Sequence, residues 1–278
     1  DILDLDTISL MQLEIENLNV LDEVLVFSKT NKKYIKFTAY FRNVQFNQFK
    51  PQYYMDGIVE YYVSNKNGRA KINVLQNRSL KDVTIKQIDE KGMLRLNFNI
   101  AGVPNFDDFI DFEKIKNEYV TDRFGNTFFL YSDGRETGKL EAERENIFLS
   151  LEIYSPERPK VMKLFGTEYI LKKYSVSAIY KDTYNNLNHL KDLLYFKEYR
   201  EYDIKQKKEE NYTYITTINE VFIIDKEFTD EEPSSKDSFY SFIDKSNYGE
   251  PFWESIKSDY IVPLPKTVNI FIKDKLAE

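Results

Sequence analysis

Apolar and polar residues alternate along most of this chain, and that period-two pattern predicts β-strands with one buried face. It is plainest where Ile35, Phe37, Ala39 and Phe41 alternate with more polar neighbours. The same texture recurs in the ranges 53–63, 70–75, 93–100, 128–131, 139–154, 163–181, 190–205 and 212–224. Strands in such number favour a large antiparallel sheet, which we expect to be strongly curved.

Short turn sequences separate several of these predicted strands. Asn67-Gly68 stands between two of them, and Asn-Gly is a strong hairpin signal because both turn positions need a positive φ. Residues 132–135 (Ser-Asp-Gly-Arg) predict a second turn, and the charged range 205–210 predicts a hairpin tip. The strands are therefore expected to follow one another as antiparallel neighbours.

Two segments carry helical spacing instead. In the range 105–119, apolar residues recur every three or four positions after a capping Asn105. A short C-terminal helix is predicted after Pro263 and Pro265, with Val268, Phe271, Ile272 and Leu276 on one face. The predicted class is therefore α+β, mostly antiparallel β, with a few helices.

The amino-acid composition argues against several classes of protein and of reactive site. The 278 residues include 15% aromatics but only 9 glycines, which suits long strands better than a glycine-punctuated nucleotide fold. The net charge of −7 argues against a general nucleic-acid binder. The absence of cysteine excludes disulfides and thiolate sites. No run approaches 18 apolar residues, so no transmembrane helix of its own is expected.

The candidate reactive motifs all lack essential parts. His189 is the single histidine, and no Gly-x-Ser-x-Gly elbow supplies a nucleophile for it. The range 132–139 resembles a phosphate loop, but its glycine spacing is one residue short and Leu140 replaces the magnesium-binding hydroxyl. No residue is therefore predicted to act in catalysis or to hold a cofactor.

An acidic stretch, residues 225–236, contains Pro233 and is predicted to be a loop. Its carboxylates could hold calcium, although the range 225–232 lacks the ligand alternation and central glycine of an EF-hand. We interpret it as a solvated acidic loop and predict no metal ligand. Tyr53, Tyr54, Tyr61, Tyr62 and Trp253 could stack on sugars if their rings were exposed, but strand aromatics more often pack across strands.

The first residues carry the strongest pointer to a family. Asp6-Thr-Ile-Ser-Leu10, followed by Leu21-Asp-Glu-Val-Leu-Val26, resembles the end of the carboxypeptidase-regulatory-like β-sandwich that precedes TonB-dependent transporters of the SusC type in Bacteroidetes. The range 1–28 is thus predicted to hold the last strand or strands of that sandwich and a tether, with the earlier strands lying upstream. The polar range 29–33 marks the boundary to a second, β-rich domain, residues 29–278.

The rest of the chain resembles Bacteroidetes proteins known only as carboxypeptidase-regulatory-like domain-containing. The features that carry the resemblance are Tyr40-Phe-Arg42, Gly57-Ile-Val-Glu-Tyr-Tyr62, Gly249-Glu-Pro-Phe-Trp-Glu254 and Pro263-Leu264. The resemblance implies an exported protein of the periplasm or outer-membrane surface, and it implies no peptidase, because the zinc ligands of true carboxypeptidases are lacking.

Three functions remain open. The preferred hypothesis is a non-enzymatic accessory or scaffold subunit of an envelope transport or outer-membrane protein assembly complex, with an outer-membrane β-barrel protein as its partner. The alternative is a periplasmic carrier that binds a lipid or other apolar ligand in the curved sheet. The second alternative is a hydrolase working without histidine or cysteine. Fold-level analogy alone does not decide among them.

Overall fold

The computed structural model describes residues 32–66, 70–82, 119–164, 166–181, 192–231, 246–257 and 260–276. The predictions for the ranges 1–28, 93–100 and 105–118 and for His189 lie outside these residues. Within them the chain forms eleven strands, a short 3-10 helix and one α-helix. The strands are β1 (Tyr34–Asn47), β2 (Lys50–Ser64), β3 (Ala70–Lys81), β4 (Val120–Phe124), β5 (Thr127–Ser132), β6 (Arg135–Glu143), β7 (Asn146–Tyr154), β8 (Val161–Leu164), β9 (Thr167–Lys181), β10 (Leu193–Lys205) and β11 (Thr213–Thr229), and the helices are η5 (Phe252–Glu254) and α5 (Lys266–Leu276).

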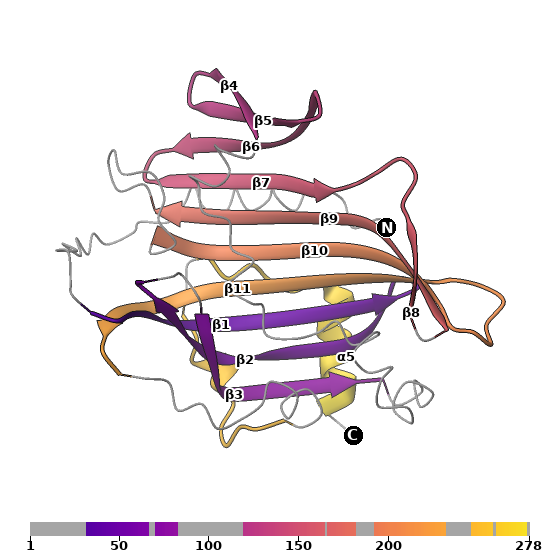
Figure 1. Cartoon of the computed structure of the whole chain (residues 1–278). Helices are drawn as coiled ribbons and strands as arrows, with labels where there is room; N and C mark the ends of the chain where they lie inside the picture. Colours follow the sequence, from indigo (N-terminus) through magenta and orange to yellow (C-terminus); the bar gives the residue numbers. More distant parts are fainter. Residues whose placement is uncertain are drawn as a thin grey trace.

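All eleven strands join one large unclosed sheet in which neighbours are antiparallel (Figure 1). The order is β3-β2-β1-β11-β10-β9-β7-β6-β5-β4, with β8 paired to β9. Two meanders therefore meet where β1, the first described strand, pairs with β11, the last. The predicted fold class, mostly antiparallel β with a large sheet, is confirmed.

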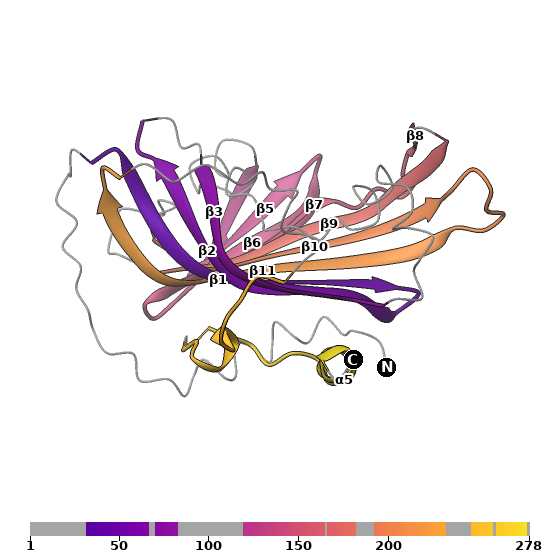
Figure 2. The same ribbon diagram turned by 90° about the horizontal axis from the view of Figure 1, so that it is seen from below.

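The sheet is strongly curved. Figure 2 shows the strands curving together, with η5 and α5 on the outer, convex side. Register shifts occur between Thr38 and Ala39, between Gln45 and Phe46, and between Ile58 and Val59. Bulges of this kind bend a strand and increase its twist, which explains how strands of up to 17 residues follow the curve.

Strict alternation divides the side chains between the two faces. On β1, Phe37, Ala39 and Phe41 belong to the main hydrophobic cluster of the concave face. Tyr40 and Val44, between and beyond them, belong to separate clusters under the C-terminal segment on the convex face. Both faces of the sheet are therefore apolar, which is why so many strand residues of either parity are buried.

The turn at residues 132–135 and the C-terminal helix are confirmed, whereas the Asn67-Gly68 turn lies outside the described residues. Asp133 and Gly134 both have positive φ in the turn between β5 and β6. The range 139–154 forms two strands, because the chain reverses at Arg144, which also has positive φ. Residues 266–276 form the predicted C-terminal helix, with Val268 and Ile272 buried.

The loop prediction for the acidic stretch is wrong over residues 225–229. These residues extend β11 and pair with the first residues of β1, Tyr34–Thr38. Lys36 on β1 forms an ion pair with Glu227, so the neighbouring strand compensates an acidic side chain that looked repulsive in the sequence. The density of acidic residues therefore led to a wrong loop prediction. The alternation of Lys226 and Phe228 with acidic residues indicated the strand better.

Candidate functional site: the concave face

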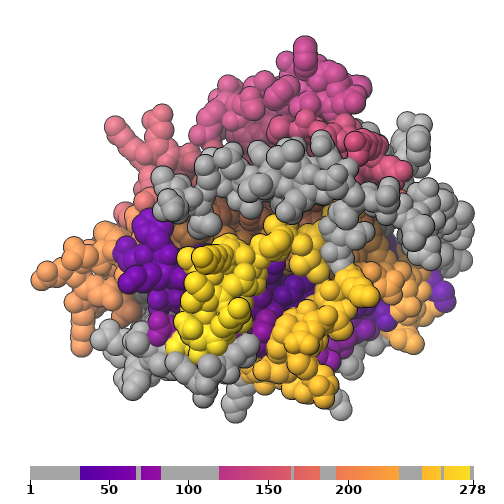
Figure 3. All heavy atoms as spheres, turned by 180° about the vertical axis from the view of Figure 1, so that it is seen from behind, coloured from indigo at the N-terminus to yellow at the C-terminus, as the bar shows by residue number. Residues whose placement is uncertain are grey.

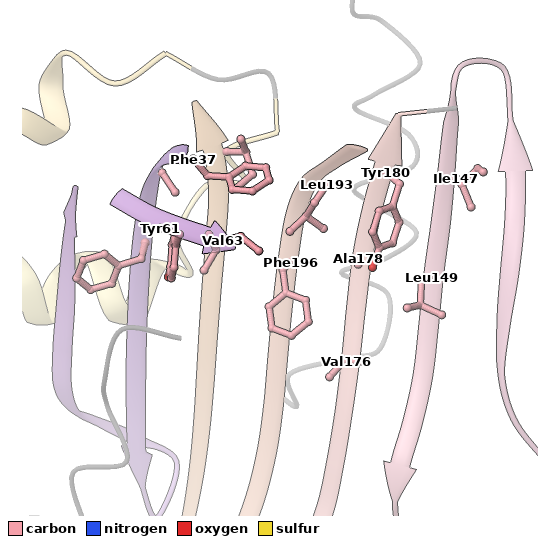
Figure 4. Close-up of a cluster of buried hydrophobic side chains, with 14 of the residues drawn as sticks. Phe37, Tyr61, Val63, Ile147, Leu149, Val176, Ala178, Tyr180, Leu193 and Phe196 are labelled. Carbon is pink, nitrogen blue, oxygen red and sulfur yellow. The ribbon is translucent and has the colours of Figure 1, made fainter. Parts of the chain in front are cut away.

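The concave face carries a continuous apolar layer. Phe41, Val221, Phe196, Ala178 and Leu149 stand opposite one another across β1, β11, β10, β9 and β7, and all are buried. Figure 4 shows several of them together with the neighbouring residues of the cluster. Cross-strand rows of this kind bury apolar side chains side by side, so the layer extends across the sheet.

Strands supply almost all of this layer. Every described member of the cluster lies on a strand except Tyr119, which comes directly before β4. Among the described residues, the C-terminal segment packs on the opposite face (Figure 3), against Tyr40, Tyr54 and Phe222. The concave side therefore carries a broad, buried apolar layer that is separate from the packing of η5 and α5.

A polar belt, buried except for the half-buried Arg200 and Tyr174, borders the apolar layer farther along the same strands. It consists of two cross-strand rows. The first row holds Asn43, Asn219 and Glu198, and the second holds Gln45, Thr217, Arg200 and Tyr174. Burial of so many polar groups on one face is costly unless each finds a partner.

Part of the belt is internally bonded. Asn43 donates to Asn219, and the Nδ2 of Asn219 donates to Glu198 Oε2 at 2.9 Å. The other oxygen of Glu198 accepts from Tyr174 Oη at 2.9 Å and from Arg200 Nη2 at 2.7 Å. Burial, with the charge of Glu198 next, raises the pKa of Tyr174 to about 12, so that phenol remains a hydrogen-bond donor at neutral pH.

The convex face holds a different polar arrangement, a ladder of alternating charges. Arg78, Asp56, Arg42, Glu220 and Lys197 lie opposite one another on β3, β2, β1, β11 and β10. Arg42 pairs with Glu220, which also accepts from Tyr195 at 2.8 Å. Burial alone would raise the pKa of Glu220, but the adjacent Arg42 guanidinium outweighs burial and lowers it. Glu220 is thus held in its charged form.

Asp56 is the most enclosed member of this ladder. It is 0% exposed and accepts from Arg78 Nε and Nη2 at 2.9 and 2.6 Å. The hydroxyls of Tyr40 and Tyr54 donate to it at 2.9 and 2.8 Å. Burial, with the charge of Asp56 next, raises the pKa of both tyrosines, which keeps them protonated as donors.

The C-terminal segment closes over the ladder. The Arg78 guanidinium lies 3.8 Å from the centroid of the Trp253 ring, a cation–π contact. Asn247 forms a β-bridge with Asn77, and Val268 and Ile272 of α5 pack beside Tyr54. The convex polar groups therefore serve to attach the chain's own C-terminus.

The motifs singled out in the sequence are dispersed. The range 132–139 forms the β5–β6 turn and the start of β6, which opens no helix. Tyr53, Tyr54, Tyr61 and Tyr62 are all at most 6% exposed, so they pack in the fold and form no exposed platform for sugars. Within the described residues, no group of three acidic or histidine side chains could hold a metal ion.

Sequence reasoning missed the belt and the ladder. Both depend on which residues stand opposite each other, and register is set by turns and bulges. One signal was present: polar Arg42, Asn43 and Gln45 interrupt an otherwise apolar strand.

No protein-family model and no curated protein matches this chain. In the described residues, no helix is long and apolar enough to cross a membrane.

Proposed function

We propose that this protein is a non-enzymatic carrier of the bacterial envelope that binds a lipid or other apolar ligand against the concave face of its sheet. The observation that carries the proposal is the apolar layer, which spans β1, β2, β11, β10, β9, β7, β6 and β5. Small-molecule sites are concave and mostly apolar, with a few polar groups that fix orientation. A single curved sheet with an apolar layer beside a polar belt has this composition.

The placement in the envelope rests on the resemblance of residues 1–26 to the tail of a carboxypeptidase-regulatory-like domain. No enzymatic role is proposed, because the ionised groups found together on the described faces are paired with each other in the ladder and in the Glu198–Arg200 pair.

Displacement of a fluorescent fatty-acid probe tests the carrier. Purified protein should bind the probe saturably with one-to-one stoichiometry, and organic extraction followed by mass spectrometry should identify a co-purified lipid. Ala178 is the smallest side chain in the central apolar row, so Ala178→Phe should weaken probe binding by at least about tenfold. Ser177→Phe, one residue away on the other face, is the matched control. Non-saturable binding by the unmodified protein would contradict the proposal.

An accessory subunit of an outer-membrane transport or assembly complex is the second candidate. It is favoured by the end strand β4, where Val120 and Phe124 are 74% and 81% exposed. Edge strands with exposed apolar residues invite pairing with another chain. Crosslinking in intact envelopes should then recover an outer-membrane β-barrel protein with the unmodified chain and lose it with Phe124→Lys. Recovery of the protein alone in both cases would exclude this role.

A further inference from the structure

Three hairpins have their turns at the same end of the sheet, where β1 meets β2, β8 meets β9 and β10 meets β11 (Figure 1). Val161 on β8 stands opposite Ile170 on β9, and Ile170 stands opposite Asp203 on β10. Asp203 stands opposite Tyr214 on β11, whose carbonyl oxygen accepts from the Gln48 amide of the β1–β2 turn at 2.9 Å. One row across the sheet therefore connects the three turns. We name this region the turn end, and it comprises residues 47–51, 157–172 and 203–213.

Large apolar side chains are exposed at the turn end. Phe49 is 74% exposed, and Val161 and Met162 are 49% and 56% exposed. The strands β11, β10 and β9 lie between β1 and β8, so Phe49 and Val161 are about four strand spacings, or ~19 Å, apart. Apolar groups spread over this width, and standing on turns, fit a broad, flat partner better than a small molecule.

The backbone of the β1–β2 turn is strained where it presents Phe49. Gln48 and Phe49 have φ values of 50° and 65°, the left-handed conformation of a type I′ turn, for which Asn-Gly is the usual sequence. A side chain with a Cβ is disfavoured there, and strain of this kind is concentrated at functional positions. The Phe49 ring contacts Tyr214, with 5.1 Å between the centroids, yet most of it stays exposed. A strained and exposed phenylalanine therefore indicates a partner that contacts its ring.

The charge of the turn end is opposite in sign to that of the chain. Its residues include eight basic and five acidic side chains, a net charge of +3, whereas the whole chain carries −7. Glu168 is paired with Lys163 at 2.8 Å, and Asp203 is paired with Lys172 at 3.3 Å. Within the described part of the chain, five exposed basic side chains of the turn end form no ion pair: Lys50, Arg158, Lys160, Lys207 and Lys208. These cations are available to an anionic surface.

Apolar tips set among exposed cations match a membrane that contains anionic lipids. Apolar side chains enter the boundary between headgroups and acyl chains, where aromatic rings are favoured, while lysine and arginine reach the phosphates. A bilayer accepts separate tips without a shaped pocket for each, whereas a folded acidic protein would need one. We propose that the turn end docks this protein on an anionic lipid surface with Phe49 inserted. This proposal concerns another surface than the concave face and does not depend on the carrier function.

Vesicle binding tests the docking. The full chain is sedimented with vesicles of phosphatidylcholine alone and with vesicles of phosphatidylglycerol and phosphatidylcholine in equal parts. A cation near an anionic surface contributes about fivefold in affinity. With a net charge of +3, the turn end should therefore bind the anionic vesicles at least about tenfold more tightly. Binding should weaken as salt is added, because salt screens exposed charges.

Removal of the aromatic tip tests the role of Phe49. Phe49→Gly should weaken binding to the anionic vesicles at least about tenfold. The variant should stay folded, because glycine accepts the positive φ and relief of strain offsets the lost contact with Tyr214. Circular dichroism checks folding. Phe124→Gly is the matched control, because Phe124 is 81% exposed and the register from β4 to β9 places it at the opposite end of the strands. The control should bind like the unmodified protein.

Charge reversal tests the cations in the same way. Lys207→Glu/Lys208→Glu should weaken binding at least about tenfold, since two exposed cations become anions. The matched control is Lys66→Glu/Lys71→Glu, which changes the net charge equally. Lys66 and Lys71 are exposed beside the end of β2 and the start of β3, at the opposite end of the strands. This control should change the affinity by less than about threefold.

Insertion separates a membrane from an acidic protein partner. The emission of Phe49→Trp should shift to the blue on anionic vesicles and be quenched by brominated phosphatidylglycerol. The unmodified chain is the reference, because its Trp253 lies against Arg78 under the C-terminal segment. Equal affinity for both kinds of vesicle, an unchanged Phe49→Trp emission, or equal losses in the controls and the turn-end variants would overturn the proposal. Capture on immobilised poly-L-glutamate without binding to vesicles would also overturn it and indicate a protein partner. Each of these outcomes leaves the carrier function intact, because the fluorescent-probe assay measures that function without vesicles.

Discussion

Removing the carboxylate of Asp56 should destabilise the protein far more than removing an exposed one. Asp56 is 0% exposed and neutralises Arg78 through two hydrogen bonds, while the hydroxyls of Tyr40 and Tyr54 donate to the same group. The variant Asp56→Asn leaves the Arg78 charge buried under the Trp253 ring with no counter-charge on the adjacent strand.

The magnitude follows from the burial of the pair. The Arg78 and Asp56 side chains are 5% and 0% exposed. Breaking a buried ion pair from one side typically costs about 3–5 kcal/mol, because the remaining charge stays desolvated. Replacing both partners removes that penalty, so Asp56→Asn/Arg78→Met should be less destabilised than Asp56→Asn alone. The coupling energy of the double-mutant cycle should reach about 2–3 kcal/mol.

Urea unfolding provides the assay, followed by far-UV circular dichroism and by fluorescence. Trp253 is the single tryptophan of the chain and lies on the Arg78 guanidinium, so its emission reports attachment of the C-terminal segment. The matched control is Asp230→Asn, which removes an exposed carboxylate that pairs with Lys32 at 2.6 Å. Its free energy of unfolding should change little, because solvent screens an exposed pair. A loss no larger for Asp56→Asn than for the control, or additive effects in the cycle, would refute the reasoning.

Three further predictions concern acid stability, alkaline stability and a close backbone approach. Hydrogen bonds from Lys163 and Tyr212 lower the pKa of Glu168 to about 2, so its contribution to stability is present above about pH 4.5 and is lost toward pH 2; Glu168→Gln should lack this acid dependence in urea titrations. Burial lowers the pKa of Lys226 to about 8, against 10.5 for an ordinary lysine; the Asp192 charge opposes this shift and the Lys181 charge adds to it. The unfolded chain then binds more protons between these values, so stability should rise from pH 8 to about 10.5, and Lys226→Met should flatten that rise. Gly57→Ala would place a Cβ 2.2 Å from Gln76 O and 2.7 Å from the Phe41 ring; its melting temperature should fall by several degrees or more, whereas Gly249→Ala, with no atom within 4 Å, should melt like the unmodified protein.

The sequence was sufficient for most of the described strands and for the fold class. Alternation along residues 34–42 and 53–63 reflects the pleat directly, because each side chain must choose one of two faces. The C-terminal helix was equally clear, since Val268 and Ile272 are one helical turn apart and both are buried. This information lies in the local periodicity of each segment, so it can be recognised without knowing the tertiary structure.

Strand order and register were beyond the sequence. Nothing local to residues 34–47 indicates that β1 pairs with β11, nearly 200 residues later in the chain. That pairing turns Glu227 from a repelling charge into the partner of Lys36, and it brings Asn43 beside Asn219. The extent of β11, the belt and the ladder all follow from one long-range pairing, so they could not be predicted before the topology was known.

Two adjacent residues of β1 show how the ladder and the belt differ in their hydrogen bonding. Arg42 points to the convex face, where Glu220 pairs with it and the C-terminal segment covers the ladder. Asn43 points to the concave face, where its Oδ1 has no partner among the described residues. Both sites are buried and both lie on the same strand, so burial alone does not separate them. The ladder satisfies its polar groups within the chain and is expected to stabilise the fold when intact. The belt leaves Asn43 Oδ1 and Gln45 Oε1 without partners among the described residues, so it should stabilise the fold less than the ladder does.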